Sequence, residues 1–120
     1  MKCYRDLVVW QDGVNLVVDV YTLSRKLPNE ERFALCNQMQ RAAVSIPSNI
    51  AEGHARTSRK EFQHYLSISL GSLAELETHL IIAQKLYSVD EVVCAKMFKQ
   101  ADILGKRLRS LQKTLQRKVD

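Results

Sequence analysis

Residues 58–86 read SRKEFQHYLSISLGSLAELETHLIIAQKL and carry the clearest structural signal in the chain. The segment opens with a capping box, in which Ser58 caps a helix and Glu61 reaches back to it. Gly71 costs about 1 kcal/mol relative to Ala inside a helix, so we expect a neighbouring helix to approach closely there. Apolar and small side chains recur at the spacing of one helix face, namely Phe62, Leu66, Ser69, Leu73, Leu76, Leu80 and Ala83.

The segment before it carries a second helical pattern. Pro47 falls inside this pattern, and because an interior proline removes one backbone hydrogen bond, we expect a kink near residues 44–47. Gly53 stands where a C-terminal cap would stand. The apolar positions of this helix are Leu35, Met39, Ala42, Ile46 and Ile50.

Two further helices flank this pair. Residues 7–27 carry two apolar stripes, which suits a helix that contacts two neighbours, or one neighbour and another subunit. One stripe is Leu7, Trp10, Val14, Val17 and Tyr21, and the other is Val9, Leu16, Val20, Leu23 and Leu27. At the other end, residues 88–91 form a second capping box, with Ser88 as the cap. The helix that follows has the stripe Val93, Met97, Ala101, Leu104, Leu108, Leu111 and Leu115.

The connections between these helices are short, which makes consecutive helices antiparallel neighbours. We therefore predict an all-α fold, an antiparallel up-down-up-down four-helix bundle, as a single domain over residues 1–120. The composition agrees, with 46% hydrophobic and 26% charged residues, the balance of an ordinary soluble domain. Four Gly and two Pro are too few for the many tight turns of a sandwich or barrel.

The cysteines and the N-terminal region bear on the compartment. Three widely spaced cysteines, at positions 3, 36 and 94, do not form a disulfide framework. No N-terminal stretch has the pattern of a secretory signal, and no window reaches 18 apolar residues. We expect a reduced, cytoplasmic protein without a membrane span.

The net charge of +5 is concentrated in one place. Residues 1–105 carry twelve Lys or Arg and twelve Asp or Glu, whereas residues 106–120 carry six and one. Four of these cations share one narrow sector of the last helix, and two flank it. Such a row suits a phosphate backbone, although it is also what a solvated basic face at a helix C-terminus looks like. The four are Lys106, Arg109, Lys113 and Arg117, and the flanking pair is Arg107 and Lys118.

A second basic patch surrounds the loop before the long helix. It comprises His54, Arg56, Arg59 and Lys60, and its last two cations adjoin a helix N-terminus, where free N–H groups favour anions. An ordinary exposed loop explains it equally well. Our candidate nucleic-acid-binding residues are therefore Lys106, Arg107, Arg109, Lys113, Arg117, Lys118, Arg56, Arg59 and Lys60.

Metal and catalytic patterns are sparse. Di-metal bundles need two Glu-x-x-His motifs and two further Glu, and this chain has one such motif, Glu61 to His64, plus the neighbours Glu75 and His79. The cysteines lack the spacing of a zinc site, and no nucleophile elbow, P-loop or dinucleotide motif is present. We expect no enzymatic activity, cofactor, metal or small-molecule substrate. An enzyme or metal protein remains an alternative that rests on those four residues.

Three blocks of sequence resemble one family. Residues 39–53, MQRAAVSIPSNIAEG, look like the signature of the bacterial four helix bundle proteins, also called the 23S rRNA intervening-sequence protein family, or S23. Residues 6–11, DLVVWQ, resemble its opening motif, and residues 71–80, GSLAELETHL, resemble its third-helix motif. The resemblance covers nearly the whole chain and is weakest in the C-terminal helix.

The resemblance implies an antiparallel four-helix bundle without catalytic residues. Members of the family, and the similar accessory variability protein of diversity-generating retroelements, form ring-like homopentamers. That accessory protein is a positively charged barrel that works with nucleic acid and a reverse transcriptase. We therefore expect a non-catalytic homo-oligomer, a pentamer by resemblance alone, that binds RNA or DNA through its basic C-terminal helix. The alternative is a protein-interaction scaffold without nucleic-acid affinity.

Overall fold

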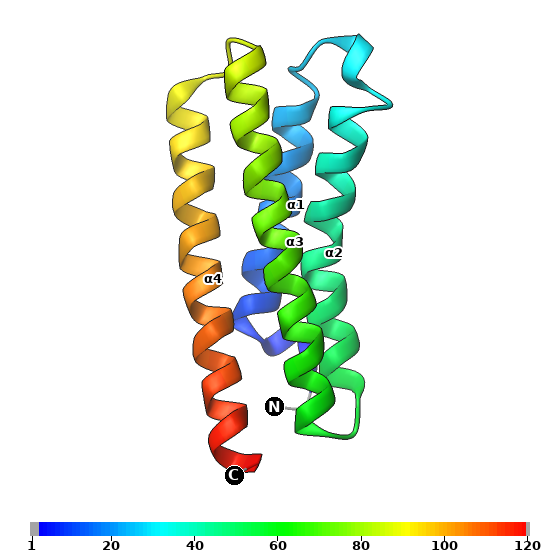
Figure 1. The fold of residues 1–120 in the computed structure, drawn as a ribbon, viewed down its shortest axis with the longest axis vertical. Coiled ribbons are helices and arrows are strands. Elements are labelled where there is room, and N and C mark those ends of the chain that lie inside the picture. The colour runs from blue at the N-terminus through cyan, green and yellow to red at the C-terminus, as the bar shows by residue number, and fades with distance from the viewer. Residues whose placement is uncertain (1–2, 120) are drawn as a thin grey trace.

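The computed structural model describes residues 3–119, with side chains described as far as Arg117. Its helices are α1 (Val8–Ser24), α2 (Leu35–Ala55), α3 (Arg59–Leu86) and α4 (Glu91–Val119), with short 3₁₀ turns η1 (Tyr4–Asp6) and η2 (Asn29–Glu31). The chain runs up, down, up and down through an elongated bundle of 48 × 24 × 20 Å (Figure 1). The predicted fold class is confirmed, and the described residues contain no strand.

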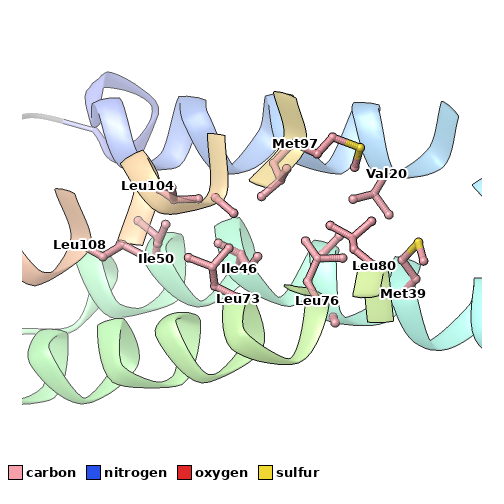
Figure 2. Close-up of a cluster of buried hydrophobic side chains, with 14 of the residues drawn as sticks. Val20, Met39, Ile46, Ile50, Leu73, Leu76, Leu80, Met97, Leu104 and Leu108 are labelled. Carbon is pink, nitrogen blue, oxygen red and sulfur yellow. The ribbon is translucent and has the colours of Figure 1, made fainter. Parts of the chain in front are cut away.

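The helices form a closed ring of neighbours around one core. α1 and α3 each contact both α2 and α4. Side chains from all four helices meet in the middle, including Val20, Met39, Leu76, Met97 and Leu104 (Figure 2). The stripe predicted within residues 58–86 is buried at every position. Of the two stripes predicted within residues 7–27, the one from Val9 to Leu27 is buried, whereas four members of the other, Trp10, Val14, Val17 and Tyr21, are half-buried.

Gly53 does not end α2, and the expectation of a C-terminal cap there was wrong. α2 continues to Ala55, and no glycine among the described residues has a positive φ. A Cβ at Gly53 would lie 2.6 Å from Cβ of Tyr65 and 3.0 Å from Cδ1 of Phe62, both on α3. The glycine is needed for this close approach of two helices, since real Cβ contacts are never so short.

Pro47 lies inside α2, which runs unbroken from Leu35 to Ala55. Its ring faces α1, where a Cβ at Gly13 would lie 3.3 Å from Cβ of Pro47. On the side of α2 that faces α3, Ser69 Oγ donates a 2.9 Å hydrogen bond to the carbonyl of Ile46. Glycine and proline thus let α1 and α2 approach closely, and a buried hydroxyl ties α2 to α3.

The long helix begins as predicted and the last one does not. Ser58 Oγ accepts a 3.1 Å hydrogen bond from the backbone N–H of Glu61, which confirms the cap of α3. At α4, Oδ1 of Asp90 accepts bonds from the N–H groups of Val92 (2.9 Å) and Val93 (3.2 Å). Asp90 is therefore the cap in place of Ser88, because its carboxylate lies next to the first free N–H groups of the helix.

Gly71 does not mark a close approach between helices, and this expectation was also wrong. The residue is exposed, and apart from its chain neighbours and the nearby backbone of α3 itself, no described heavy atom lies within 4 Å of the position its Cβ would occupy. Its sector of α3 faces away from the core.

By length and composition, α3 is the one helix among the described residues that is apolar enough to cross a membrane. A core helix of a soluble protein passes the same test, and the apolar stripe of α3 is buried within this bundle.

Candidate nucleic-acid interface

The two predicted basic patches meet at one end of the bundle. Because α3 and α4 are antiparallel, the first turns of α3 lie beside the last turns of α4, at the lower end in Figure 1. Between them is an open groove of about 620 Å³. Its lining residues are Lys60, Gln63, His64, Ser67, Arg109, Gln112, Lys113 and Gln116.

Cations stand on both sides of this α3–α4 groove. Lys60 comes from α3, whereas Arg109 and Lys113 come from α4, one helical turn apart. None of the eight lining residues is acidic. Like charges on both walls give a positive local potential that attracts anions. The sequence predicted these three residues in two separate patches, and the fold brings them together.

The floor of the groove is a network of side-chain amides. Gln63 Nε2 donates to the carbonyl of Gln112 (3.1 Å) and to Oε1 of Gln116 (3.0 Å). In return, Gln112 Nε2 donates to the carbonyl of Gln63 (3.2 Å) and to Oγ of Ser67 (2.8 Å). These reciprocal bonds fix how α3 and α4 are aligned along their length. The sequence analysis did not identify these residues. The pattern that could have indicated them is a pair of polar side chains four residues apart on each helix, Gln63 and Ser67 on α3 and Gln112 and Gln116 on α4.

Arg109 lies at the upper limit of the groove. A Cβ at Gly105 would be 3.2 Å from Nη1 of Arg109 and 3.5 Å from Leu73, so the guanidinium folds over this glycine. Burial raises the pKa of the nearby Glu77 carboxyl, the carboxylate of Asp102 raises it further, and Arg109 lowers it. Arg109 therefore stands between carboxylates on one side and the open groove on the other.

Other predicted residues point elsewhere. Nη1 of Arg107 pairs with Oδ2 of Asp12 at 2.6 Å, which ties α4 to α1 on a different side of the helix. Nζ of Lys106 lies 3.1 Å from Oδ2 of Asp102, and both side chains are exposed. These contacts leave Lys106 accessible, but Arg107 serves as a structural tie.

The loop cation Arg56 is held by its neighbours. Its guanidinium donates to Oε1 of Glu52 (2.8 Å) and to the hydroxyl of Tyr65 (2.7 Å), and lies 5.1 Å from the Tyr65 ring centroid. Arg59 begins α3 and Arg117 lies in the last turn of α4, so these two exposed residues are at the same end of the bundle as the groove. The side chain of Lys118 lies outside the described residues.

The four residues of the metal alternative do not come together. Oε1 of Glu61 lies 3.3 Å from the cap hydroxyl of Ser58, and His64 lines the groove. Further up α3, Oε2 of Glu75 lies 3.8 Å from Nε2 of the buried His79. Within the part of the chain that the structure describes, no three His, Cys, Asp or Glu side chains form a cluster that could hold a metal ion.

Comparisons with known proteins agree with the fold. A search of the curated proteins found no significant match. Among solved structures, a crystal structure of a protein of unknown function from the S23 ribosomal protein family of Bacteroides thetaiotaomicron VPI-5482 is similar. It has a TM-score of 0.81 and 26% sequence identity, and the alignment covers 88% of this chain and 99% of that one.

The model of the family described as 23S rRNA-intervening sequence protein matches residues 5–110. The match includes the helix contacts around Pro47 and Gly53 and ends within α4. Of the cations on the groove walls, Lys60 and Arg109 lie inside the match and Lys113 lies beyond it. This chain belongs to the 23S rRNA-intervening sequence protein family.

Proposed function

We propose that this protein is a non-catalytic, cytoplasmic, oligomeric nucleic-acid-binding protein that holds the phosphate backbone of RNA or DNA in the α3–α4 groove. The observation that carries the proposal is the convergence of Lys60, Arg109 and Lys113 on one groove without an acidic lining residue. Lysine and arginine on a polyanion release its condensed counterions, which supplies sequence-independent affinity.

The lining of the groove favours contacts with the backbone over contacts with bases. No Trp, Tyr or Phe lines it and His64 is its one ring, so it lacks the series of aromatic stacking platforms of a typical single-strand site. The amide donors of Gln63 and Gln112 already bind protein acceptors. What remains is positive charge, which positions a nucleic acid without reading its sequence.

Self-association is part of the proposal. On α1 and α2, Val18 is 59% exposed and Val44 is 41% exposed, next to the half-buried stripe from Trp10 to Tyr21. A second copy that covers these side chains accounts for the surplus apolar surface of α1. Several copies would present several grooves to one polyanion, and such multivalency strengthens weak individual contacts. Light scattering after size-exclusion chromatography measures the assembly, and Val18→Glu with Val44→Glu is expected to reduce its mass.

The binding test is fluorescence anisotropy with structured RNA, single-stranded RNA and duplex DNA across a salt series. A groove variant carries Lys60→Gln, Arg109→Gln and Lys113→Gln. Its control carries Arg41→Gln, Lys85→Gln and Lys99→Gln, which remove the same charge from exposed positions outside the groove. We expect the groove variant to lose at least about tenfold in affinity, and the control to lose much less.

Equal losses in the two variants would contradict a groove-specific site. Absence of binding to all three probes near physiological salt would contradict the proposal as a whole. The exposed apolar side chains would then favour the protein-interaction scaffold, whose signature is a protein partner that co-purifies from native cells.

A further inference from the structure

A second pocket lies at the opposite end of the bundle, where the chain passes from α1 to α2. It has a volume of about 460 Å³, which is within the range of small-molecule sites. The residues relevant to its chemistry are Arg25, Asn29, Arg32, Phe33, Asn37 and Gln40. In Figure 1 this connection is the cyan segment at the top, far from the α3–α4 groove.

The charged side chains that line this α1–α2 pocket are positive, with the carboxylates of Glu30 and Glu31 beside it in η2. Arg25 and Arg32 line it, and none of its lining residues is acidic. Neither arginine forms an ion pair within the described residues. A guanidinium presents a planar set of donors that matches a phosphate group in two simultaneous hydrogen bonds. The pocket therefore offers a phosphate site of the kind that arginine makes best.

An aromatic ring stands beside these cations. Phe33 is 84% exposed, the largest exposure among the large hydrophobic side chains that the structure describes. The guanidinium carbon of Arg32 lies 5.3 Å from the centroid of its ring. A phenylalanine left in water keeps its apolar surface hydrated, so a planar ligand that stacks on the ring gains free energy by removing part of that surface from water. Aromatic rings of this kind stack unpaired bases in nucleic-acid-binding proteins.

Some polar side chains of the pocket are hydrogen-bonded to the protein, and others have amides that can bind a ligand. Cys36 Sγ donates to the carbonyl of Ser24 (3.4 Å), and Gln40 Nε2 donates to the Ser24 hydroxyl (2.9 Å), which fixes the floor. The amide groups of Asn29 and Asn37 are exposed and make no side-chain hydrogen bond within the described residues. Such amides can both donate to and accept from the edge of a base.

We propose that the α1–α2 pocket binds a nucleoside phosphate, with the base on Phe33 and the phosphate on Arg25 and Arg32. The source is either a free nucleotide or an unpaired nucleotide within a strand, and both present the same chemistry. This site goes beyond the proposed function, because it supplies the stacking that the α3–α4 groove lacks and does not require that groove to bind.

The test is isothermal titration of the full chain with AMP, and with adenosine and inorganic phosphate as part ligands. Phe33→Ala and the double variant Arg25→Gln with Arg32→Gln are each expected to weaken AMP at least tenfold. Phe33→Ala should weaken the binding of adenosine and leave that of phosphate unchanged. The arginine variant should weaken the binding of phosphate and leave that of adenosine unchanged. All substituted side chains are exposed, and circular dichroism checks that the fold is kept.

The groove variant of Lys60, Arg109 and Lys113 is the matched control and should bind AMP unchanged. If this variant binds polyanions as tightly as the unaltered protein, the proposed function is refuted and this site is unaffected. No AMP binding at millimolar concentration, or AMP binding that Phe33→Ala leaves unchanged, would overturn the pocket proposal.

Single-stranded and duplex RNA distinguish the two sources. If Phe33→Ala weakens AMP and single-stranded RNA but not duplex RNA, the pocket takes unpaired nucleotides within a strand. If it weakens AMP alone, the ligand is a free nucleotide.

Discussion

The α2–α3 interface and the α3–α4 groove share one helix but use it in opposite ways. Against α2, α3 meets small residues, and the backbones come so close that only glycine fits at position 53. Against the end of α4, α3 meets glutamines that hydrogen-bond across the gap, beneath walls that carry cations. The stretch that most resembles the family thus makes helix contacts, and the candidate binding residues lie elsewhere. Resemblance in such a motif reports the fold more directly than the function.

The largest expected effect is at the α2–α3 interface. Gly53→Ala places a Cβ 2.6 Å from Cβ of Tyr65, and overpacking of this kind costs about 3 kcal/mol. Urea denaturation followed by circular dichroism measures the loss. An unchanged urea midpoint would mean that α2 and α3 can move apart at little cost and that the two regions differ little in how tightly they are packed.

Substitutions in the α3–α4 groove should have the opposite effect, so that affinity for nucleic acid is lost and stability is kept. In the groove variant of Lys60, Arg109 and Lys113, each lost phosphate contact should flatten the plot of log affinity against log salt by about 0.9 for duplex DNA. The free energy of unfolding should change by less than about 0.5 kcal/mol per exposed substitution. Anisotropy across the salt series and urea denaturation of the same variant give both numbers. A strongly destabilised variant would place these cations in the framework of the bundle.

A substitution in the floor should affect both properties modestly. Gln112→Ala removes the donor to the carbonyl of Gln63 and to Ser67, which costs about 1 kcal/mol. It also loosens the alignment of the groove walls, so polyanion affinity should fall although no charge is lost. Denaturation and anisotropy on one sample test this coupling. Unaltered affinity would show that charge alone suffices.

Gly71→Ala is the same change as Gly53→Ala at a position with free space. In an exposed helix interior, alanine should raise stability by about 0.5 to 1 kcal/mol. Thermal unfolding measures the gain. A loss of stability together with a smaller mass in light scattering would place another subunit against this side of α3.

The smallest expected effect appears only in alkali. The Tyr87 hydroxyl donates to Oε2 of Glu31, and this bond is the main cause that raises the pKa of Tyr87 to about 12. Since the ordinary tyrosine pKa is about 10, the bond stabilises the fold fully below that pH, and the contribution is lost as the pH rises through about 12. Absorbance titration of the phenolate, compared with Tyr87→Phe, should resolve one late tyrosine. If all the tyrosine hydroxyls instead ionise together near pH 10, the bond to Glu31 is ruled out.

The helices and the buried stripe of α3 could be predicted because periodicity is a local property of the sequence. The roles of Gly53 and Gly71 could not, since what approaches a glycine depends on which side chain of another helix stands opposite. Two capping residues, Ser88 and Asp90, fit the start of α4, and only the geometry distinguishes them.

The two basic segments were predicted, but their union in one groove was not. It depends on the antiparallel alignment of α3 and α4 and on amides that carry no charge pattern.

The amide floor also has a consequence for how the molecule opens. Beyond Leu108, α4 contributes only the partly buried Leu111 and Leu115 to the core among the residues described, so hydrogen bonds between glutamines hold a larger share of its last turns. Segments with little apolar burial open without global unfolding. Backbone amides of residues 109–117 should therefore exchange with deuterium sooner than those of the middle of α4, and a bound polyanion should slow that exchange.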